Sequence, residues 1–382
     1  MLEKITAVFI EKFSEQPIVF HSPGRINILG EHTDYNEGFV LPAAIDKNIY
    51  VAISKRKDNL INLYACDFSE AYSTDTERIK PSSIQWPNYI LGVFDQLQKQ
   101  GHAIDGFNLV IDGDIPMGAG LSSSAAVECA VAFALNEVFQ LGIDKMQMAL
   151  FAQKAEHIFA GVNCGIMDQF ASMFGKKDHA VKLDCRSLEY EYIPVDLTGY
   201  RILLFNSNVK HNLASSEYNS RRRQCEEGVS VIAEDHSYVK SLRDVTIETL
   251  NAYATSLDPV VFKRCKYVIE ENRRLLEACD NLKQGDVKAL GKKMFETHYG
   301  LQYEYEVSCK ELDFLVDYVK DNDNVAGARM VGGGFGGCTI NLIKEGAVEK
   351  LVEEISIAYK KEMNFILSVY PVSIESGTGR IL

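Results

Sequence analysis

Basic residues are in the minority in this sequence. Its 382 residues include 40 Lys and Arg against 53 Asp and Glu, which gives a formal net charge of −13. Nucleic-acid binding depends on Lys and Arg that neutralise phosphates, and anionic membranes likewise attract basic segments. The charge therefore argues against nucleic-acid and membrane partners. A phosphate site in such a chain has to be local, built from backbone N–H groups, a helix N-terminus and a metal ion.

The sequence also lacks paired cysteines, a targeting segment and a long apolar run. Its nine cysteines include no CxxC pair, so neither a zinc site nor a redox motif is indicated. The first residues carry acidic side chains in a helical pattern, without the basic start and apolar core of a signal peptide. No apolar run approaches the ~20 residues that a membrane span needs. We expect a cytoplasmic protein whose thiols are reduced and mostly buried.

No internal repeat, low-complexity tract or obvious linker divides the chain. The length suggests two or three domains, and we place one boundary near residue 200, where helical patterns become more frequent. This gives domains 1–200 and 201–382. Expected strands are 18–22, 49–55, 107–112, 180–183, 202–205, 328–331, 338–343 and 365–372. Expected helices are 1–14, 122–139, 145–159, 213–233, 259–279, 286–300, 309–319 and 346–361.

Residues 116–125 form a glycine- and serine-rich motif, PMGAGLSSSA. Two glycines let the backbone bend and approach a ligand closely, and three serines, which are good N-cap residues, then lead into a helix. The first N–H groups of a helix lack internal partners, and its dipole favours an anion there. The motif is therefore a candidate phosphate site, and it is not a Walker A loop because no Gly-Lys-Ser/Thr follows. An ordinary serine-capped helix is the alternative interpretation.

A second glycine cluster occupies residues 332–337, GGGFGG, and satisfies the pattern GxGxxG. A dinucleotide-binding turn leads from a strand into a helix. Here residues 338–343 have the pattern of a strand, so the dinucleotide interpretation is rejected. Two interpretations remain, a close backbone approach to a ligand and a tight hairpin. Five glycines in six residues are more than a hairpin needs, which favours ligand approach.

Polar side chains are concentrated between Gly24 and Gly38. This segment holds Glu31, His32 and Asp34, whose carboxylate and imidazole groups can bond the hydroxyls of a sugar. A solvated polar turn is the alternative interpretation.

Other charged residues stand further along the chain. Asp168 lies in the otherwise apolar run CGIMDQF, residues 164–170. A carboxylate buried in such a run needs a partner and is often functional. Taken alone, Glu156 is predicted to be a surface helix residue, and the triple arginine 221–223 predicts a solvated helix face.

Taken in order, these motifs resemble the galactokinases of the GHMP kinase family. Residues 24–38, GRINILGEHTDYNEG, resemble the galactokinase signature. Residues 116–126, PMGAGLSSSAA, resemble the phosphate-binding motif of the family, and residues 332–340, GGGFGGCTI, resemble its third motif. Further similar segments are CGIMDQFAS at 164–172, SNVKHNLASSEY at 207–218 and RRRQC at 221–225. The resemblance covers residues 18–376, and the ordered coincidence of the motifs makes it highly specific.

The resemblance implies roles for single positions. Asp168 matches the catalytic base, and Arg25 matches the arginine that contacts the transferring phosphoryl group and the catalytic carboxylate. Sugar contacts are implied for Glu31, His32, Thr33, Asp34, Gly165 and Tyr218. The triphosphate loop is implied for Gly118, Ala119, Gly120, Leu121, Ser122, Ser123 and Ser124. A magnesium site is implied for Ser124 and Glu156, an aromatic contact near adenine for Trp86, and a further nucleotide contact for Asp67.

The implied fold is the two-domain α+β GHMP kinase fold. It combines a ribosomal-protein-like N-terminal domain with a GHMP C-terminal domain, places the active site in the cleft between them, and lets the last strand pack back on the N-terminal domain. The implied reaction transfers the γ-phosphoryl group of ATP to the anomeric hydroxyl of α-D-galactose, with Mg²⁺ as cofactor. We expect a monomer whose partners are galactose and ATP.

Two rival interpretations stay open at this point. A kinase for N-acetylgalactosamine or arabinose would share the mechanism, although Thr33, Asn36 and Cys164 look like galactokinase residues. A non-catalytic sensor of galactose and ATP would lack part of the phosphate motif, whereas that motif and Asp168 are intact here.

Overall fold

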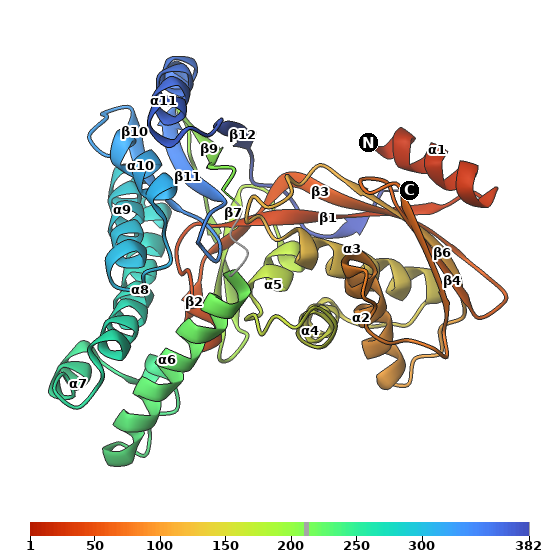
Figure 1. The fold of residues 1–382 in the computed structure, drawn as a ribbon, viewed down its shortest axis with the longest axis horizontal. Coiled ribbons are helices and arrows are strands. Elements are labelled where there is room, and N and C mark those ends of the chain that lie inside the picture. Colours follow the sequence, from red (N-terminus) through yellow and green to blue (C-terminus); the bar gives the residue numbers. More distant parts are fainter. Residues whose placement is uncertain (210–213, 382) are drawn as a thin grey trace.

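The computed structural model describes residues 1–209 and 214–381. Within these residues the chain forms three β-sheets, of six, four and three strands, with helices packed on them. Figure 1 shows the N-terminal half, coloured red to yellow, beside the C-terminal half, coloured green to blue, along the longest axis of the molecule. The predicted α+β class is confirmed.

The strands of the described residues are numbered in sequence order. They are β1 (Ile18–Asn27), β2 (Phe39–Val40), β3 (Pro42–Lys55), β4 (Leu60–Ala65), β5 (Glu70–Asp75), β6 (Phe107–Gly113), β7 (His179–Asp184), β8 (Tyr190–Pro194), β9 (Tyr200–Asn206), β10 (Val325–Met330), β11 (Cys338–Lys344), β12 (Ser368–Val372) and β13 (Gly379–Arg380). The sheet orders are β13-β1-β3-β6-β4-β5, β10-β11-β9-β12 and β2-β7-β8.

Helices are more frequent after β9, as the sequence predicts. They are α1 (Leu2–Phe13), α2 (Gln85–Lys99), α3 (Ser123–Phe139), α4 (Lys145–Ala155), α5 (Met167–Phe174), α6 (Ala214–Asp235), α7 (Ile247–Ala252), α8 (Pro259–Lys283), α9 (Val287–Tyr303), α10 (Lys310–Val319) and α11 (Val348–Met363). Short helical turns are η1 (Asp34–Asn36), the π-helical η2 (Glu156–Ala160), η3 (Leu242–Asp244) and η4 (Glu345–Ala347).

The six-stranded sheet buries both faces because successive side chains on a strand point in opposite directions. In the pairing of β1 with β3, Val19 lies opposite Ala52 and Phe20 lies opposite Val51. The first pair packs under α1, and the second belongs to the large core that α3 helps to form. Figure 1 shows α1 on one side of this sheet and α2, α3 and α4 on the other.

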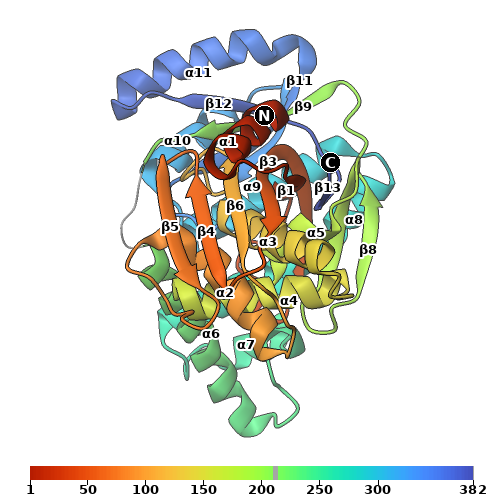
Figure 2. The same ribbon diagram turned by 90° about the vertical axis from the view of Figure 1, so that its right-hand side faces the viewer.

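The four-stranded sheet follows the same logic with β9 in its interior. Leu203 and Phe205 of β9 pack with Leu351 and Ile355 of α11, while Leu204 faces the large core. Figure 2 shows α11 crossing one end of the molecule beside β12. This sheet therefore holds the C-terminal helices against the rest of the protein.

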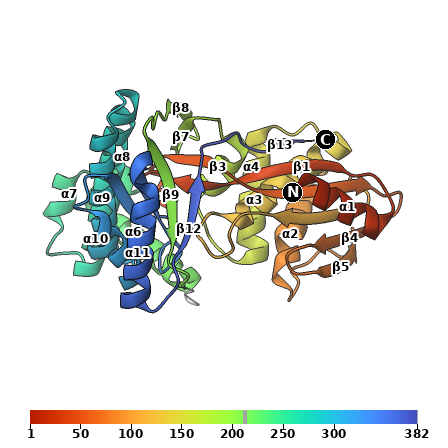
Figure 3. The ribbon, with the colours of Figure 1, turned by 90° about the horizontal axis from the view of Figure 1, so that it is seen from above.

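The end of the chain returns to the first sheet. Ile374 bridges to Ile45, and β13 pairs with β1 through Phe20 and Arg380. Figure 3 shows the C-terminus on the N-terminal side of the molecule. Because the four-stranded sheet begins with β9 at residue 200, we propose the division at that residue for the two domains.

Most of the expected elements are present, but several were not anticipated. The predicted helix 145–159 ends as an α-helix at Ala155 and continues as the π-helical turn η2. The sequence-based expectation missed β2, β4, β5, β8, β13, α2, α5 and α7. The start of the predicted helix 213–233, at residue 213, lies outside the described residues. In the part of the chain that is described, no helix is long and apolar enough to cross a membrane.

Candidate active site

Arg25 and Asp168 form an ion pair although they lie 143 positions apart in the sequence. Arg25 Nε donates to Asp168 Oδ1 over 2.8 Å, and Nη2 donates to Oδ2 over 2.9 Å. Ser122 Oγ also donates to Oδ2, and Arg25 Nη1 donates to the Gly120 carbonyl over 2.7 Å. This two-point pairing fixes the plane of the carboxylate. Arg25 is buried while 25% of the Asp168 side chain stays exposed, so the carboxylate is accessible to a ligand.

Local backbone features bring this pair together. Arg25 follows an irregularity in the pairing of β1 with β3. At Gly24 a Cβ would stand 2.8 Å from the Leu121 carbonyl oxygen, so a larger residue would push the phosphate loop away. Asp168 lies in the first turn of α5, where the helix dipole favours a negative charge.

The loop 118–124 is anchored by its buried side chains. Ala119 and Leu121 are buried, whereas Gly118 and Gly120 are exposed and adopt φ values of 72° and 74°. Glycine adopts this left-handed conformation without strain. The backbone of the loop is therefore open to a ligand at the point where α3 begins with Ser123, and the first N–H groups of a helix have no partner within the helix.

Ser122 departs from the predicted serine cap. It precedes α3 with a φ of 58°, makes no capping hydrogen bond, and donates its hydroxyl to Asp168 instead. A capping residue normally has an extended backbone, which directs its oxygen to the N–H groups of the first turn. The left-handed backbone of Ser122 excludes that geometry, so the cap prediction is wrong for this residue.

Ser124 and Glu156 also meet, as the magnesium assignment requires. Ser124 Oγ donates to Glu156 Oε1 over 3.0 Å, and Gln169 Nε2 donates to Glu156 Oε2 over 2.7 Å. Glu156 is buried in the π-helical turn η2, so the prediction of a surface residue is wrong. Burial, followed by the negative charge of Asp168, raises the pKa of the Glu156 carboxyl.

Most of the predicted sugar-binding side chains surround one small cavity of about 130 Å³, which we call the polar pocket. Its lining residues are Arg25, Glu31, His32, Asp34, Glu156, Val162, Cys164, Met167, Asp168, Tyr218, Gly332 and Gly333. Burial and the nearby charge of Asp168 raise the pKa of Asp34 to about 7. Burial lowers the pKa of His32 to about 4. The pocket therefore holds several charged and hydrogen-bonding groups in a volume suited to a small polar ligand.

Two predicted sugar contacts lie outside the described lining of this pocket. Thr33 is fully buried, and its hydroxyl donates to the carbonyls of Gly30, over 2.8 Å, and Phe39. Gly165 packs against Asp34, whose carboxylate a Cβ on Gly165 would overlap. Thr33 thus holds the turn in shape, and Gly165 leaves room for Asp34.

A second cavity, of about 480 Å³, adjoins the start of α3, and we call it the apolar cavity. Its lining residues are Ile49, Ala65, Asp67, Phe68, Glu70, Ile84, Gln85, Trp86, Tyr89, Ile111, Asp112, Ile115, Met117, Ser123, Ser124 and Val127. It contains the predicted nucleotide contacts Asp67 and Trp86. Trp86 Nε1 donates to Glu70 Oε2 over 3.0 Å, which fixes the indole at the cavity wall.

The glycine loop 332–337 joins the antiparallel strands β10 and β11, and Gly332 and Gly333 also line the polar pocket, so the favoured interpretation of a close approach to a ligand stays a prediction. Its glycines also allow close packing on the phosphate loop. A Cβ would stand 3.0 Å from the Gly120 carbonyl oxygen at Gly332, and 3.3 Å from that of Ala119 at Gly337. The two loops therefore meet beside Gly332, which lines the polar pocket.

Comparison with known proteins explains this combination of features. Residues 7–55 match the galactokinase galactose-binding signature, residues 88–176 match the GHMP kinase N-terminal domain, and residues 250–361 match the GHMP kinase C-terminal domain. A galactokinase from Thermotoga petrophila is 45% identical over 360 residues, which cover 94% of this chain and 99% of that protein. The chain belongs to the galactokinase family of GHMP kinases.

Further relatives agree with this family. A galactokinase from Thermosipho africanus is 42% identical, with 94% of this chain and 99% of that protein covered. The crystal structure of Lactococcus lactis galactokinase complexed with galactose has a TM-score of 0.96 at 34% identity, with both chains fully covered. Mevalonate kinase from Methanococcus jannaschii, at 17% identity and a TM-score of 0.68 over 94% of this chain and 99% of that one, shares the fold. The predicted GHMP kinase fold is confirmed.

The structure of this galactokinase family member also reveals residues that the sequence-based assignment missed. Arg329, on β10, is fully buried and donates to Glu31 Oε1 over 3.0 Å. A single arginine before a glycine run, in an otherwise apolar strand, is a signal that could have found it. Glu128 lies one turn after Ser124 on α3, is fully buried, and accepts from Gln169.

Arg221 contradicts the prediction that the triple arginine is a solvated helix face. It is buried, and it donates to the carbonyls of Tyr305, over 2.8 Å, and Glu306, over 2.7 Å. Its two neighbours, Arg222 and Arg223, are more exposed. Successive positions on a helix point in different directions, so Arg221 points into the protein while Arg222 and Arg223 lie nearer to solvent.

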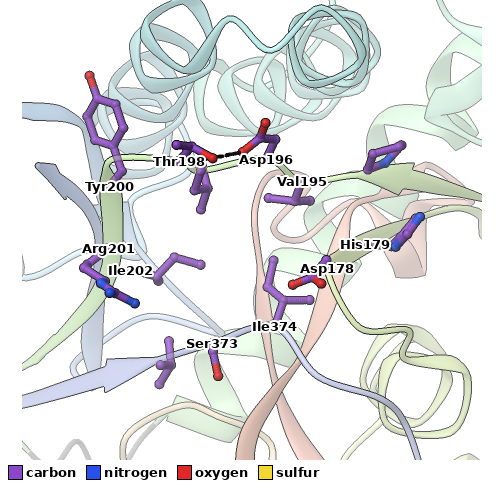
Figure 4. A pocket seen from close by; sticks show the side chains of 13 residues that line it. Asp178, His179, Val195, Asp196, Thr198, Tyr200, Arg201, Ile202, Ser373 and Ile374 are labelled. Atoms are coloured by element: carbon purple, nitrogen blue, oxygen red, sulfur yellow. Dashed lines mark hydrogen bonds between the residues drawn. The ribbon is translucent and has the colours of Figure 1, made fainter. Parts of the chain in front are cut away.

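A third cavity, of about 520 Å³, lies apart from the family motifs, and none of the predicted site residues is in its described lining. Figure 4 shows Asp178 and His179 on one side of it, Tyr200 and Arg201 on another, and Ile374 below. It is formed where the chain passes from β8 to β9 and from β12 to β13.

Proposed function

We propose that the protein transfers the γ-phosphoryl group of ATP to the anomeric hydroxyl of α-D-galactose, giving galactose 1-phosphate and ADP. The observation that carries this proposal is the position of Asp168. Arg25 and Ser122 hold its carboxylate at the wall of the polar pocket. Arg25 also contacts the phosphate loop at the Gly120 carbonyl, and Ser122 belongs to that loop. A sugar hydroxyl in the pocket and a phosphoryl group on the loop would therefore meet beside one carboxylate.

Asp168 and Arg25 would divide the chemistry between them. The anomeric oxygen forms a bond to the γ-phosphorus, the bond from that phosphorus to the bridging oxygen of ADP breaks, and the hydroxyl proton passes to Asp168. Arg25 would face the γ-phosphoryl oxygens, where its charge stabilises the transition state. Because Arg25 also fixes the plane of the carboxylate, one side chain positions the base and neutralises the transferring group.

The sugar would be held by the polar side chains opposite this pair. Asp34, Glu31, His32 and Tyr218 line the pocket and offer acceptors and donors to several hydroxyls. We assign Thr33 and Gly165 a supporting role, since Thr33 is engaged with backbone carbonyls and Gly165 makes room for Asp34.

ATP would extend from the phosphate loop into the apolar cavity. The residues from Gly118 to Ser124 would surround the triphosphate with backbone N–H groups, supported by the N-terminus of α3. The adenine ring would lie against Trp86, and Asp67 offers a carboxylate to the nucleotide in the same cavity. The cavity opens at Ser123 and Ser124, which joins the base site to the phosphate site.

Magnesium is the cofactor that we propose, and Ser124 with Glu156 would hold it. Their oxygens fit a hard cation, and they lie 3.0 Å apart at the boundary between the two cavities. Among the described residues, no group of three or more His, Cys, Asp and Glu side chains is arranged to hold a metal. The phosphates would then supply the other ligands, and the bound ion would neutralise their charge.

The remaining expectations also stay proposals. We propose a cytoplasmic enzyme, which is supported by nine cysteines that are all free thiols. We propose a monomer with ATP and galactose as its partners. The net charge of −13 opposes nucleic acid and anionic membranes as partners.

The first test is ADP release with ATP, Mg²⁺ and a panel of sugars that contains galactose, N-acetylgalactosamine, arabinose and glucose. We expect turnover on galactose and a loss of about 10²–10⁴-fold in kcat for Asp168→Asn. Asp196→Asn, at an exposed carboxylate bonded to Thr198, is the matched control and should keep its turnover. Near-normal turnover of Asp168→Asn would show that this residue is not the base.

Two other outcomes would select the rival functions. Turnover on N-acetylgalactosamine or arabinose alone would keep the mechanism and change the substrate. Binding of both galactose and ATP without any turnover would indicate a sensor. The intact set of Arg25, Asp168 and Ser124 favours the enzyme over the sensor.

A further inference from the structure

Glu31 and His32 hold the glycine loop from two neighbouring positions. Glu31 Oε1 accepts from the N–H of Gly332 over 2.8 Å, and His32 Nε2 lies 3.2 Å from the carbonyl oxygen of Gly333. The same Glu31 oxygen accepts from Arg329. Two residues predicted to bind the sugar therefore also fix the backbone that closes the polar pocket.

His32 in turn belongs to a chain of polar side chains that runs away from the pocket. Its Nδ1 lies 2.7 Å from the hydroxyl of Tyr35, and that hydroxyl lies 2.8 Å from the hydroxyl of Tyr305. The Cys225 sulfur lies 3.3 Å from the Tyr305 hydroxyl. His32, Tyr305 and Cys225 are buried and Tyr35 is partly buried, so the hydrogen bonds that link them are costly to lose.

The Gly333 carbonyl and the neutral His32 ring determine which group donates in each hydrogen bond of this side-chain network. The Gly333 carbonyl only accepts, so His32 Nε2 must carry a proton. Burial lowers the pKa of His32 to about 4, so the ring is neutral near pH 7 and Nδ1 is a bare acceptor. Tyr35 then has to donate to His32, and with its one proton used it accepts from Tyr305. Tyr305 likewise accepts from the Cys225 thiol.

The chain connects elements that are far apart in the sequence. Tyr35 lies in η1 after β1, Cys225 lies on α6, and Tyr305 follows α9. The backbone on both sides of the tyrosine link is also held: Arg221 donates to the Tyr305 carbonyl, and Asn36 donates to the His32 carbonyl over 2.9 Å. The hydroxyls are therefore presented to one another by fixed backbone.

We propose that Tyr35 and Tyr305 are positioning residues for the sugar site. Their hydroxyls hold His32 in the Nε2–H tautomer and so keep the Gly333 carbonyl at the wall of the polar pocket. Neither tyrosine lies in the described lining of that pocket, and although the Tyr35 ring packs on Tyr218, the hydroxyls of Tyr35 and Tyr305 reach the pocket through His32. The consequence for galactose affinity rests on the proposed function, whereas the tautomer of His32 does not.

The tautomer is measured without any ligand. Histidine labelled with ¹⁵N and ¹³C reports which ring nitrogen carries the proton, and a His32→Gln variant assigns the signal among the eight histidines. We expect one Nε2–H form at pH 7 in the wild-type protein. In Tyr35→Phe the Gly333 carbonyl alone favours this form, so a minor Nδ1–H fraction should appear because Nδ1 has lost its donor. An Nδ1–H or doubly protonated ring in the wild-type protein would overturn the proposal.

Galactose binding is measured by calorimetry on the same variants. One lost hydrogen bond in a buried chain should weaken binding by about 3–10-fold in Tyr35→Phe and by less in Tyr305→Phe. The double variant should equal Tyr35→Phe, because the Tyr305 hydroxyl reaches His32 only through Tyr35. ADP affinity should not change, since neither tyrosine lies in the described lining of the apolar cavity.

Tyr299→Phe is the matched control. It removes a tyrosine hydroxyl that donates to Asp317 over 3.0 Å outside the described lining of either cavity, and it should bind galactose like the wild-type protein. Additive losses in the double variant, or an affinity of Tyr35→Phe equal to that of Tyr299→Phe, would contradict the positioning role. Failure of the wild-type protein to bind galactose would instead refute the proposed substrate. The tautomer measurement would still test the hydrogen bonds from the two tyrosines to His32.

Discussion

The polar pocket and the apolar cavity lie on either side of the Ser124–Glu156 hydrogen bond, and they are built in different ways. The polar pocket has about 130 Å³ and concentrates carboxylates, an imidazole and a guanidinium. The apolar cavity has about 480 Å³ and is lined mainly by aliphatic and aromatic side chains. A sugar has to be fixed by directed hydrogen bonds, whereas a flat purine ring can be held by shape and apolar contact.

This difference predicts how each region responds to substitution. Polar groups that contact each other in a small buried space are coupled, so one change should affect orientation, charge and turnover together. In the apolar cavity the contacts are spread over more residues. A single substitution there should therefore cause a smaller loss, and that loss should be confined to nucleotide affinity. Four substitutions, taken from the largest expected effect to the smallest, test whether the two regions behave so differently.

Arg25→Met should have the largest effect, because it removes a phosphoryl contact and frees the carboxylate of Asp168. We expect kcat to fall by about 10³-fold or more, as for other arginines that stabilise transferring phosphoryl groups. Steady-state kinetics measures this loss. The control is Arg56→Met. It removes a bidentate ion pair with Asp58 on the surface and should leave kcat unchanged. A loss confined to the KM for ATP would mean that Arg25 only binds nucleotide.

Glu156→Gln tests the boundary between the two regions. Its carboxylate is the proposed magnesium ligand, so Mg²⁺ should strengthen ADP binding about tenfold less in the variant than in the wild-type protein. Calorimetry of ADP with and without Mg²⁺ measures this without turnover. Glu137→Gln, at an exposed position on α3, should match the wild-type protein. An unchanged magnesium effect would remove Glu156 from the site.

Trp86→Ala should raise the KM for ATP by about tenfold while the KM for galactose stays constant, because the loss is one stacking contact. Trp86 is the only tryptophan in the chain, so the tryptophan fluorescence of the wild-type protein, excited where tyrosine does not absorb, reports on this cavity. We expect ADP to change that fluorescence and galactose to leave it nearly unchanged. A strong response to galactose would show that the two regions are not independent.

Asp34→Asn comes last because its measured effect is on stability, where the expected change is the smallest of the four. The folded-state pKa of Asp34 is about 7, above its value of 3.8 in the unfolded chain. Folding is therefore penalised as pH rises from about 4 through 7, since the buried carboxyl has to ionise beside Asp168. Between pH 5 and pH 8 the variant should gain about 1–2 kcal/mol relative to the wild-type protein, after a discount for solvent access.

Chemical unfolding at the two pH values, without galactose, measures this gain. Galactose binding should be weakened in the same variant at both pH values. A stability difference that is independent of pH would show that Asp34 does not titrate in this range.

Contiguous motifs made the polar pocket largely predictable. Glu31, His32 and Asp34 occur within four residues, so one turn brings them to the same place. The apolar cavity gave a weaker signal because its lining comes from β3, β4, α2, β6 and α3, and aliphatic residues in strands are common in any core. The helix α2, which carries Trp86, was itself not predicted.

The sequence by itself determined the family, the α+β class and the residue types at the site, because short motifs dictate local backbone such as the left-handed glycines of the phosphate loop. Only the tertiary structure decided which of these side chains face one another. Ser122 turns to Asp168, Glu156 becomes buried, and Arg221 points inward through contacts between residues far apart in the chain. Such contacts depend on burial and packing of distant elements, which local sequence patterns do not encode.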